Sequence, residues 1–367
     1  MTDIICTMPK FPIHNLQVKS FGPIAKANLE FSPQLNVIIG DNATGKSQLL
    51  KLLYTVTNVI SYTEKTEKKI NENFLERYIA DKLKGVFRPN ELGRLITRGQ
   101  GRARGEVRAK FSKIQDPLEF GFASNSKTKV EIKNIPGKPL EDTPVFLPSR
   151  ELISIYPNFV SLYDNYHLEF DETWRDTAIL LGLPALKGRK ERNAQNILKD
   201  LSEMLDGNVV EDGGRFQLKR TGGNYEAHLM SEGERKLAMI VRLVNSGKLL
   251  EGGYLFWDEP EANLNPRSQR SVAKTVAELA KQGSQVFVAT HSLFMLREFQ
   301  MLQEEHPEQE MRFIGLEKNP EGPGMVGGSF KEMADVPVIA ALEAESEQDS
   351  RFLLGAKPET LGVYNDF

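Results

Sequence analysis

Eight residues near the N-terminus have the types and spacing of a phosphate-binding loop. Residues 40–47 read G-D-N-A-T-G-K-S and follow the apolar run of residues 35–39, so they fit the pattern G-x-x-x-x-G-K-[ST] between a strand and a helix. Glycines let backbone N–H groups curl around phosphate oxygens, and the following helix adds the positive end of its dipole. We expect Lys46 to reach the β- and γ-phosphates of a nucleoside triphosphate and the Ser47 hydroxyl to hold Mg²⁺. The predicted phosphate-binding set is Gly40, Asp41, Asn42, Ala43, Thr44, Gly45, Lys46 and Ser47. The simpler alternative is a Gly-rich turn before an amphipathic helix.

Two further apolar runs end in side chains suited to phosphate chemistry. Residues 254–257 lead into Asp258 and Glu259, and residues 286–290 lead into His291. Asp258 is placed to bind Mg²⁺, and Glu259 can act as general base on an attacking water. His291 could reach the γ-phosphate or orient the water. Alternatively, the acids form an exposed turn and the histidine is only a polar strand terminus.

Residues 231–236, S-E-G-E-R-K, open a predicted helix. Ser231 as N-cap and Glu234 three residues later match a capping box. The same geometry would present the helix N-terminus, with Ser231, Gly233 and Glu234, to a phosphate. The structural and the functional interpretations are compatible, because capping fixes the end that is offered.

Hydrophobic periodicity gives the elements that must position these residues. We expect strands within residues 13–39, a helix over about 46–60, mostly helices over 151–205 and short strands over about 208–228. Helices near 233–246 and 267–281 then alternate with strands at 253–257 and 285–289, which indicates a parallel, helix-covered sheet and an α/β fold. The segment after His291 reads as mostly helical and acidic.

Composition limits the class of protein. The chain has 367 residues, 26% of them charged, a net charge of −3 and one cysteine, Cys6. A single cysteine excludes internal disulfides and fits a reducing compartment. No apolar run is long enough to span a bilayer and no secretory signal is evident, so we expect a cytoplasmic protein without membrane contact.

The four motifs in this order resemble the ATPase heads of the ABC superfamily. The opening of residues 16–24, L-Q-V-K-S-F-G-P-I, which leads directly into the P-loop, resembles the SMC, RecF and OLD-like branch, whose stand-alone members occur in bacterial antiviral defence and toxin–antitoxin-like systems. The resemblance covers residues 13–60 and roughly 205–300. It implies a P-loop NTPase fold with a mixed β-sheet core, ATP and Mg²⁺ as cofactors, and ATP hydrolysis.

The resemblance also implies a homodimer that encloses ATP. The helix start with Ser231, Gly233 and Glu234 of one subunit would cap the γ-phosphate held by residues 40–47 of the other. Residues 263–266 match the D-loop that crosses such a dimer seam. The chain departs from the branch at Ala43, where glycine is common. No Q-loop glutamine is visible, and we expect Ser149 or Arg150 to take its place.

The remaining segments suggest how the ATPase is used. We expect a nucleotide-binding domain split over residues 1–60 and 206–345, an inserted lobe of residues 61–205 with strands between 106 and 147, and a tail of residues 346–367.

No built-in effector domain is recognisable, so the first hypothesis is a switch that controls a separately encoded effector. The alternative is a DNA-associated repair ATPase of RecF type, in which the ten basic residues of segment 82–113 contact nucleic acid. Such a run is also typical of a solvated face. A transporter ATPase would need a Q-loop glutamine and a membrane partner, and the sequence offers neither.

Overall fold

A computed structural model describes residues 10–65, 72–98, 103–166, 168–250, 252–337 and 340–354. Cys6, the Gly-rich centre of the basic segment with Arg102, and residues 355–367 of the predicted tail lie outside these ranges. None of the described helices is long and apolar enough to cross a membrane.

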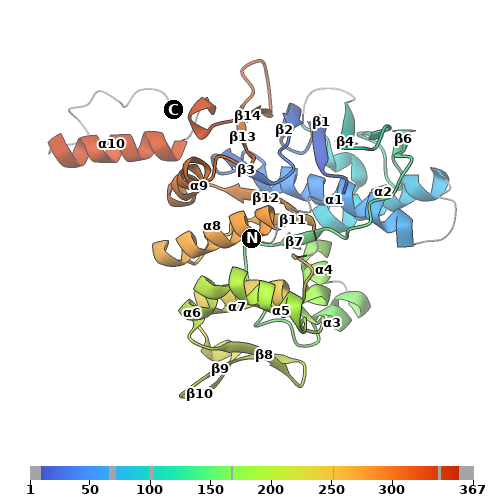
Figure 1. The fold of residues 1–367 in the computed structure, drawn as a ribbon. Helices are drawn as coiled ribbons and strands as arrows, with labels where there is room; N and C mark the ends of the chain where they lie inside the picture. Colours follow the sequence, from blue (N-terminus) through green and yellow to red (C-terminus); the bar gives the residue numbers. More distant parts are fainter. Residues whose placement is uncertain are drawn as a thin grey trace.

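One large mixed sheet organises the molecule (Figure 1). Its eleven strands lie in the order β6-β5-β4-β1-β2-β14-β13-β3-β12-β11-β7. The parallel half contains β13 (Met311–Lys318), β3 (Leu35–Gly40), β12 (Ser284–Thr290), β11 (Gly253–Asp258) and β7 (Val145–Leu147). The other half contains β1 (Ile13–Phe21), β2 (Ile24–Glu30), β4 (Arg104–Phe111), β5 (Leu118–Ala123) and β6 (Glu131–Asn134), paired antiparallel, and β14 (Met325–Phe330) joins the halves.

Helices cover both faces of the sheet and connect its strands. Six α-helices precede residue 231 in the described ranges: α1 (Lys46–Lys65), α2 (Glu72–Phe87), α3 (Phe159–Asn165), α4 (Glu172–Leu181), α5 (Arg189–Ile197) and α6 (Lys199–Leu205). The later ones are α7 (Glu232–Asn245), α8 (Pro266–Lys281), α9 (Leu293–Glu305) and α10 (Ala340–Leu354). A separate antiparallel sheet of β8 (Asn208–Asp212), β9 (Arg215–Arg220) and β10 (Gly223–Glu226) lies at the end of the molecule far from α10 (Figure 1).

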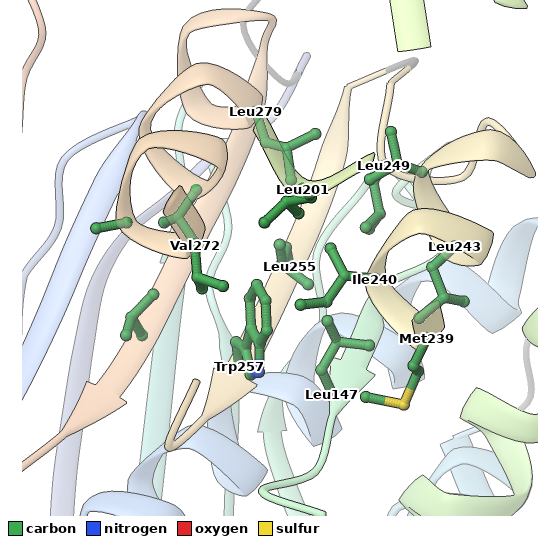
Figure 2. Packing of buried hydrophobic residues seen from close by; sticks show 14 of the residues in the cluster. Leu147, Leu201, Met239, Ile240, Leu243, Leu249, Leu255, Trp257, Val272 and Leu279 are labelled. Carbon is green, nitrogen blue, oxygen red and sulfur yellow. The ribbon is translucent and has the colours of Figure 1, made fainter. Parts of the chain in front are cut away.

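Strand β11 is apolar on both faces because each face is covered. Alternate side chains of a strand point to opposite faces of the sheet. Tyr254 and Phe256 accordingly pack in the cluster that contains the α1 side chains, whereas Leu255 and Trp257 pack in the cluster of α6, α7 and α8. Figure 2 shows Trp257 beside Leu255 in this second cluster, with Leu201 and Ile240 from the covering helices. The double cover fixes β11, and therefore fixes the acids at its carboxyl end.

The structure adds two features that the sequence did not reveal. The strands expected in an inserted lobe do not form a sheet of their own: β4–β6 extend the main sheet from β1, and β7 borders β11. The segment after His291 contains β13 and β14 besides its helices, and β13 pairs with β3. In each case the pairing partner lies far away in the sequence, so periodicity alone could not identify the sheet to which a strand belongs.

Candidate nucleotide-binding site

The predicted phosphate loop connects β3 to α1, as its motif requires. Gly40 ends β3, and Lys46 begins α1. Gly45 has a φ of +95°, and a Cβ there would lie 2.5 Å from Cγ of Pro23, so only glycine fits. Ala43 also has a positive φ, +63°, a conformation that disfavours every L-residue with a Cβ. This backbone explains why glycine would be the easier residue at the one loop position where the chain departs from the related branch.

The Lys46 side chain folds back into this loop. Its ammonium donates hydrogen bonds to the carbonyl oxygens of Gly40, at 2.9 Å, and of Asp41, at 2.8 Å. Burial lowers the pKa of Lys46, and the nearby carboxylates of Glu259 and Asp258 oppose that shift. The loop therefore holds a positive charge among backbone groups, which suits a site for an anion.

Ser47 and Asp258 meet where β3 and β11 end. Ser47 Oγ donates a hydrogen bond of 3.0 Å to Oδ1 of Asp258, although 211 residues separate them. Burial, reinforced by the charge of Glu259 and opposed by the Ser47 hydrogen bond, raises the pKa of Asp258 to about 6. A hydroxyl and a buried carboxylate are the hard oxygen ligands that Mg²⁺ uses beside phosphates, and a cation would relieve the cost of the buried charge. The residues present thus fit a magnesium ion, and nowhere in the described ranges do three or more His, Cys, Asp or Glu side chains form a metal cage of their own.

Glu259 and His291 lie together at the ends of neighbouring strands. β11 and β12 pair in parallel, with Asp258 opposite Ala289. Glu259 has a φ of +45°, and its N–H donates to the carbonyl of Ala289 at 2.8 Å. Nδ1 of His291 lies 3.3 Å from Oε1 of Glu259. The structure therefore brings the two predicted catalytic residues into contact.

Glu261 belongs to this group and was not among the predicted site residues. Its side chain is 94% buried, and Oε1 accepts hydrogen bonds from the Thr290 hydroxyl, at 2.6 Å, and from the N–H of His291, at 3.3 Å. Nδ1 of His291 lies 3.7 Å from the same oxygen. Glu261 thus ties the turn after β11 to the end of β12. The signal in the sequence was an acid two residues after Glu259, which resembles any exposed acidic turn.

The predicted signature residues lie at the start of α7 and form the expected capping box. Ser231 accepts a hydrogen bond from the N–H of Glu234, whose carboxylate accepts from Ser231 in return. Arg220 donates to Glu234 at 2.5 Å. Burial alone would raise the pKa of Glu234, but the hydrogen bonds from Arg220 and Ser231 outweigh it and lower the pKa. Glu234 is therefore a paired carboxylate, which limits its repulsion of a phosphate.

These signature residues face a groove instead of the chain's own phosphate loop. Ser231, Gly233 and Glu234 line a groove of about 960 Å³ together with the predicted D-loop residues Asn263 and Leu264. Asn263 also donates a hydrogen bond of 2.7 Å to Glu232. Within the described ranges, no hydrogen bond or ion pair joins the three signature residues to residues 40–47. The two halves of the predicted composite site are separate in one chain.

The segment after β7 holds neither Ser149 nor Arg150 in a clear Q-loop role. Arg150 is exposed, and Ser149 contributes its backbone carbonyl to a hydrogen bond from Lys236. The buried side chain is Glu151, which accepts from Nε of Arg235 at 2.6 Å. Substitution of the glutamine by Ser149 or Arg150 stays a prediction.

Acids neutralise much of the basic segment 82–113. The Lys82 ammonium is buried between Glu172, at 2.8 Å, and Asp176, at 2.9 Å. On the strands, Arg104 pairs with Glu131 at 2.6 Å, and Arg108 lies 3.4 Å from Glu119. The described members that make no ion pair with another described residue are Arg94, Arg98, Lys110 and Lys113. Charges of both signs alternate over β4–β6, as on an ordinary solvated sheet.

Comparison with known protein families shows the family to which the chain belongs. Residues 35–297 match the model of the family described as "AAA domain, putative AbiEii toxin, Type IV TA system". The chain belongs to this family. The match begins with β3 and ends within α9, so it includes the phosphate loop, the signature helix and both strand ends of the site.

Similar proteins confirm the ABC-superfamily, SMC/RecF-like resemblance and the fold. An SMC head bound to the C-winged helix domain of ScpA has a TM-score of 0.57 at 16% identity. The similarity covers 89% of the present chain and 100% of the SMC head. An SMC head with an extended coiled coil from Pyrococcus furiosus has a TM-score of 0.50 at 14% identity, over 94% and 100%. The DNA replication and repair protein RecF of Alkaliphilus oremlandii is 36% identical over 75 residues, which is 20% of either chain. The match spans a fifth of that relative's length. The chain therefore resembles the heads of the SMC/RecF-like branch of the ABC superfamily and has the fold of an SMC head.

Proposed function

We propose that this protein binds ATP at residues 40–47 and hydrolyses it to ADP and phosphate. The hydrogen bond between Ser47 and Asp258, with Glu259 and His291 beside it, is the observation that carries the proposal. It supports a single site in which a phosphate loop, two oxygen ligands and a general base converge at the ends of parallel strands, where ligands of α/β folds bind.

Each residue has a role that follows from its position. The backbone N–H groups of the loop and the Lys46 ammonium would bind the β- and γ-phosphates. Ser47 and Asp258 would hold Mg²⁺, which neutralises phosphate charge when bound. Glu259 would accept a proton from the water whose oxygen bonds to the γ-phosphorus, while the bond to the ADP oxygen breaks. His291, 3.3 Å from Glu259, would orient the water or contact the γ-phosphate.

We further propose that two copies enclose ATP head-to-tail, so that each active site is composite. The groove with Ser231, Gly233 and Glu234 supports this arrangement, because it is separate from the chain's own phosphate loop and includes the D-loop residues. The capped N-terminus of α7 would contribute N–H groups to the γ-phosphate held by the other copy. We keep the split of the nucleotide-binding domain over residues 1–60 and 206–345 as a proposed division by sequence order, and β4–β7 from the segment between them belong to the same large sheet.

The cycle of ATP binding and hydrolysis would control a separately encoded effector in a defence or toxin–antitoxin-like system. The description of the matching family, which names a type IV toxin–antitoxin system, supports this use. The SMC head bound to a ScpA domain is a structural relative that carries a partner protein. The RecF-type alternative rests on the short match to RecF and on segment 82–113, and the ion pairs of Arg104 and Arg108 weaken it.

One experiment separates the two uses. Phosphate release is measured with purified protein and Mg-ATP, with and without duplex DNA, at low and moderate salt. We expect slow turnover that DNA does not change, and co-purification of the product of an adjacent gene. DNA stimulation that fades with salt, and that is lost on charge reversal at Arg98, Arg104 and Arg108, would establish the RecF-type function instead. No phosphate release under any condition would refute the ATPase.

A further inference from the structure

Lys236 is a buried cation in the second turn of α7, directly behind the signature residues. Its side chain is 1% exposed. Its ammonium donates to the carbonyl oxygens of Glu259 at 2.7 Å, Ser149 at 2.9 Å and Ala262 at 3.1 Å, so all three of its N–H groups have a partner. Burial lowers the pKa of Lys236 to about 8, and Glu261 and Glu259 oppose that shift. Burying a charge is costly, and an apolar side chain would satisfy the packing of α7 without that cost.

The three carbonyls belong to two segments at the candidate site, the turn between β11 and α8 and the segment after β7. Glu259 directly follows β11, Ala262 lies in the turn that leads to the D-loop, and Ser149 follows β7. A single ammonium on α7 therefore holds two positions of the turn with the general base and connects this turn to the segment after β7.

The bond to Glu259 matters most, because the backbone of this residue is strained. Its φ of +45° lies in the left-handed region, which is unfavourable for a residue with a side chain. Such a conformation persists only where the surroundings hold it. Its N–H donates to the carbonyl of Ala289, and its carbonyl accepts from the Lys236 ammonium at 2.7 Å and from the Ala262 N–H at 3.1 Å. Without the Lys236 bond only the weaker Ala262 bond would hold this carbonyl, so the peptide would rotate more readily toward a relaxed conformation and the carboxylate would shift from its place beside His291.

We propose that Lys236 is a positioning residue: it holds the turn after β11 so that the Glu259 carboxylate stays where it accepts the proton of the attacking water. The inference rests on the proposed ATPase function and adds a residue to it.

The first test replaces Lys236 by methionine, which has similar length and no N–H donor. We expect kcat for ATP hydrolysis to fall about 10- to 100-fold, because a displacement of about 1 Å at a reacting group has that effect. The Kd for Mg-ADP, measured by calorimetry, should change less than about two-fold, because the phosphate loop is untouched. The matched control is Lys82→Met, which removes another buried ammonium, 5% exposed and bonded to carboxylates of α4. It should lower the melting temperature and leave kcat unchanged at 25 °C.

A second test asks whether Lys236 acts through Glu259. In a Glu259→Gln background, adding Lys236→Met should reduce the single-turnover rate no further, because residues that act as a unit are not additive. An equal loss in both backgrounds would overturn the inference. Hydrogen exchange at the Glu259 amide should rise in Lys236→Met and stay unchanged in Lys82→Met.

Lys236→Gln covers the case in which the methionine variant does not fold, because it keeps two N–H donors at the buried position. We expect it to fold with a lowered kcat and an unchanged Kd for Mg-ADP. If the wild type hydrolyses ATP and the Lys236 variants hydrolyse it equally fast, this inference is wrong and the proposed function is unaffected. Absence of turnover in the wild type would overturn the proposed function and this inference together.

Discussion

Replacing Asp258 by asparagine should stabilise the nucleotide-free protein while it impairs the site. Burial raises the pKa of this carboxyl from 3.8 to about 6. A carboxyl whose pKa is higher in the folded state stabilises the fold at low pH, below its unfolded value, and loses that contribution as pH rises through about 6. At pH 7.5 the ionised Asp258 therefore works against folding by about 3 kcal/mol, since each pKa unit corresponds to ~1.4 kcal/mol.

Asparagine removes this charge and keeps an oxygen that can accept from Ser47. The asparagine amide N–H groups also need hydrogen-bond partners at this buried position, and this requirement lowers the gain in stability by about 1 kcal/mol. The net expectation at pH 7.5 is a stabilisation of about 2 kcal/mol, or a rise in melting temperature of about 3 °C. At pH 4.5 the gain should vanish, because the wild-type carboxyl is then largely protonated in the folded state.

Thermal unfolding of protein freed of nucleotide and metal, at pH 7.5 and 4.5, measures this difference. Asp349→Asn, on the exposed face of α10, is the matched control and should shift the melting temperature by less than about 1 °C at either pH. The argument that an ionised, buried Asp258 destabilises the cation-free protein would be refuted by either of two results. One is an Asp258→Asn variant that is less stable than the wild type at pH 7.5, and the other is an equal shift of its melting temperature at both pH values.

Three further substitutions test the phosphate loop and the core. Lys46→Met should raise the Kd for Mg-ADP at least ten-fold in calorimetry, because the ammonium held in the loop is lost; unchanged affinity would remove Lys46 from the site. Ala43→Gly should leave the melting temperature unchanged or raise it by a few degrees, although such a change usually destabilises, because the φ of +63° disfavours alanine; a clear fall would argue against the left-handed conformation. Leu201→Ala, in the fully buried cluster with Trp257, should lower the free energy of unfolding by about 3 kcal/mol in urea titration, and a loss below about 1 kcal/mol would contradict the described packing (Figure 2).

The local parts of the site could be predicted from the sequence. The phosphate loop, the acids after β11 and the histidine after β12 each stand at the end of a continuous apolar run, which identifies a buried strand end. Parallel strands bring such ends to one edge of a sheet, so the meeting of Ser47 with Asp258 and of Glu259 with His291 followed from the topology. The capping box of α7 is a contact within four residues and was equally readable.

Contacts between distant segments could not be predicted in this way. Lys236 stands among charged residues at a helix start and looks like a solvated lysine, yet its partners lie 87, 23 and 26 residues away. The charges of β4 read as a basic patch until the register with β5 and β6 places acids beside them. β14 is rich in glycine and partly exposed, so it lacks the alternation that marks a strand.

The most direct test of the account is a single-turnover comparison of the wild type with Glu259→Gln. Both proteins are mixed with a limiting amount of Mg-ATP, and bound ATP, bound ADP and the size of the complex are followed. We expect the wild type to convert ATP to ADP, and the variant to convert it at least 100-fold more slowly while it accumulates as an ATP-bound dimer. Equal rates in the two proteins, with no ATP-bound dimer in the variant, would contradict the assignment of Glu259 as the general base of a composite site.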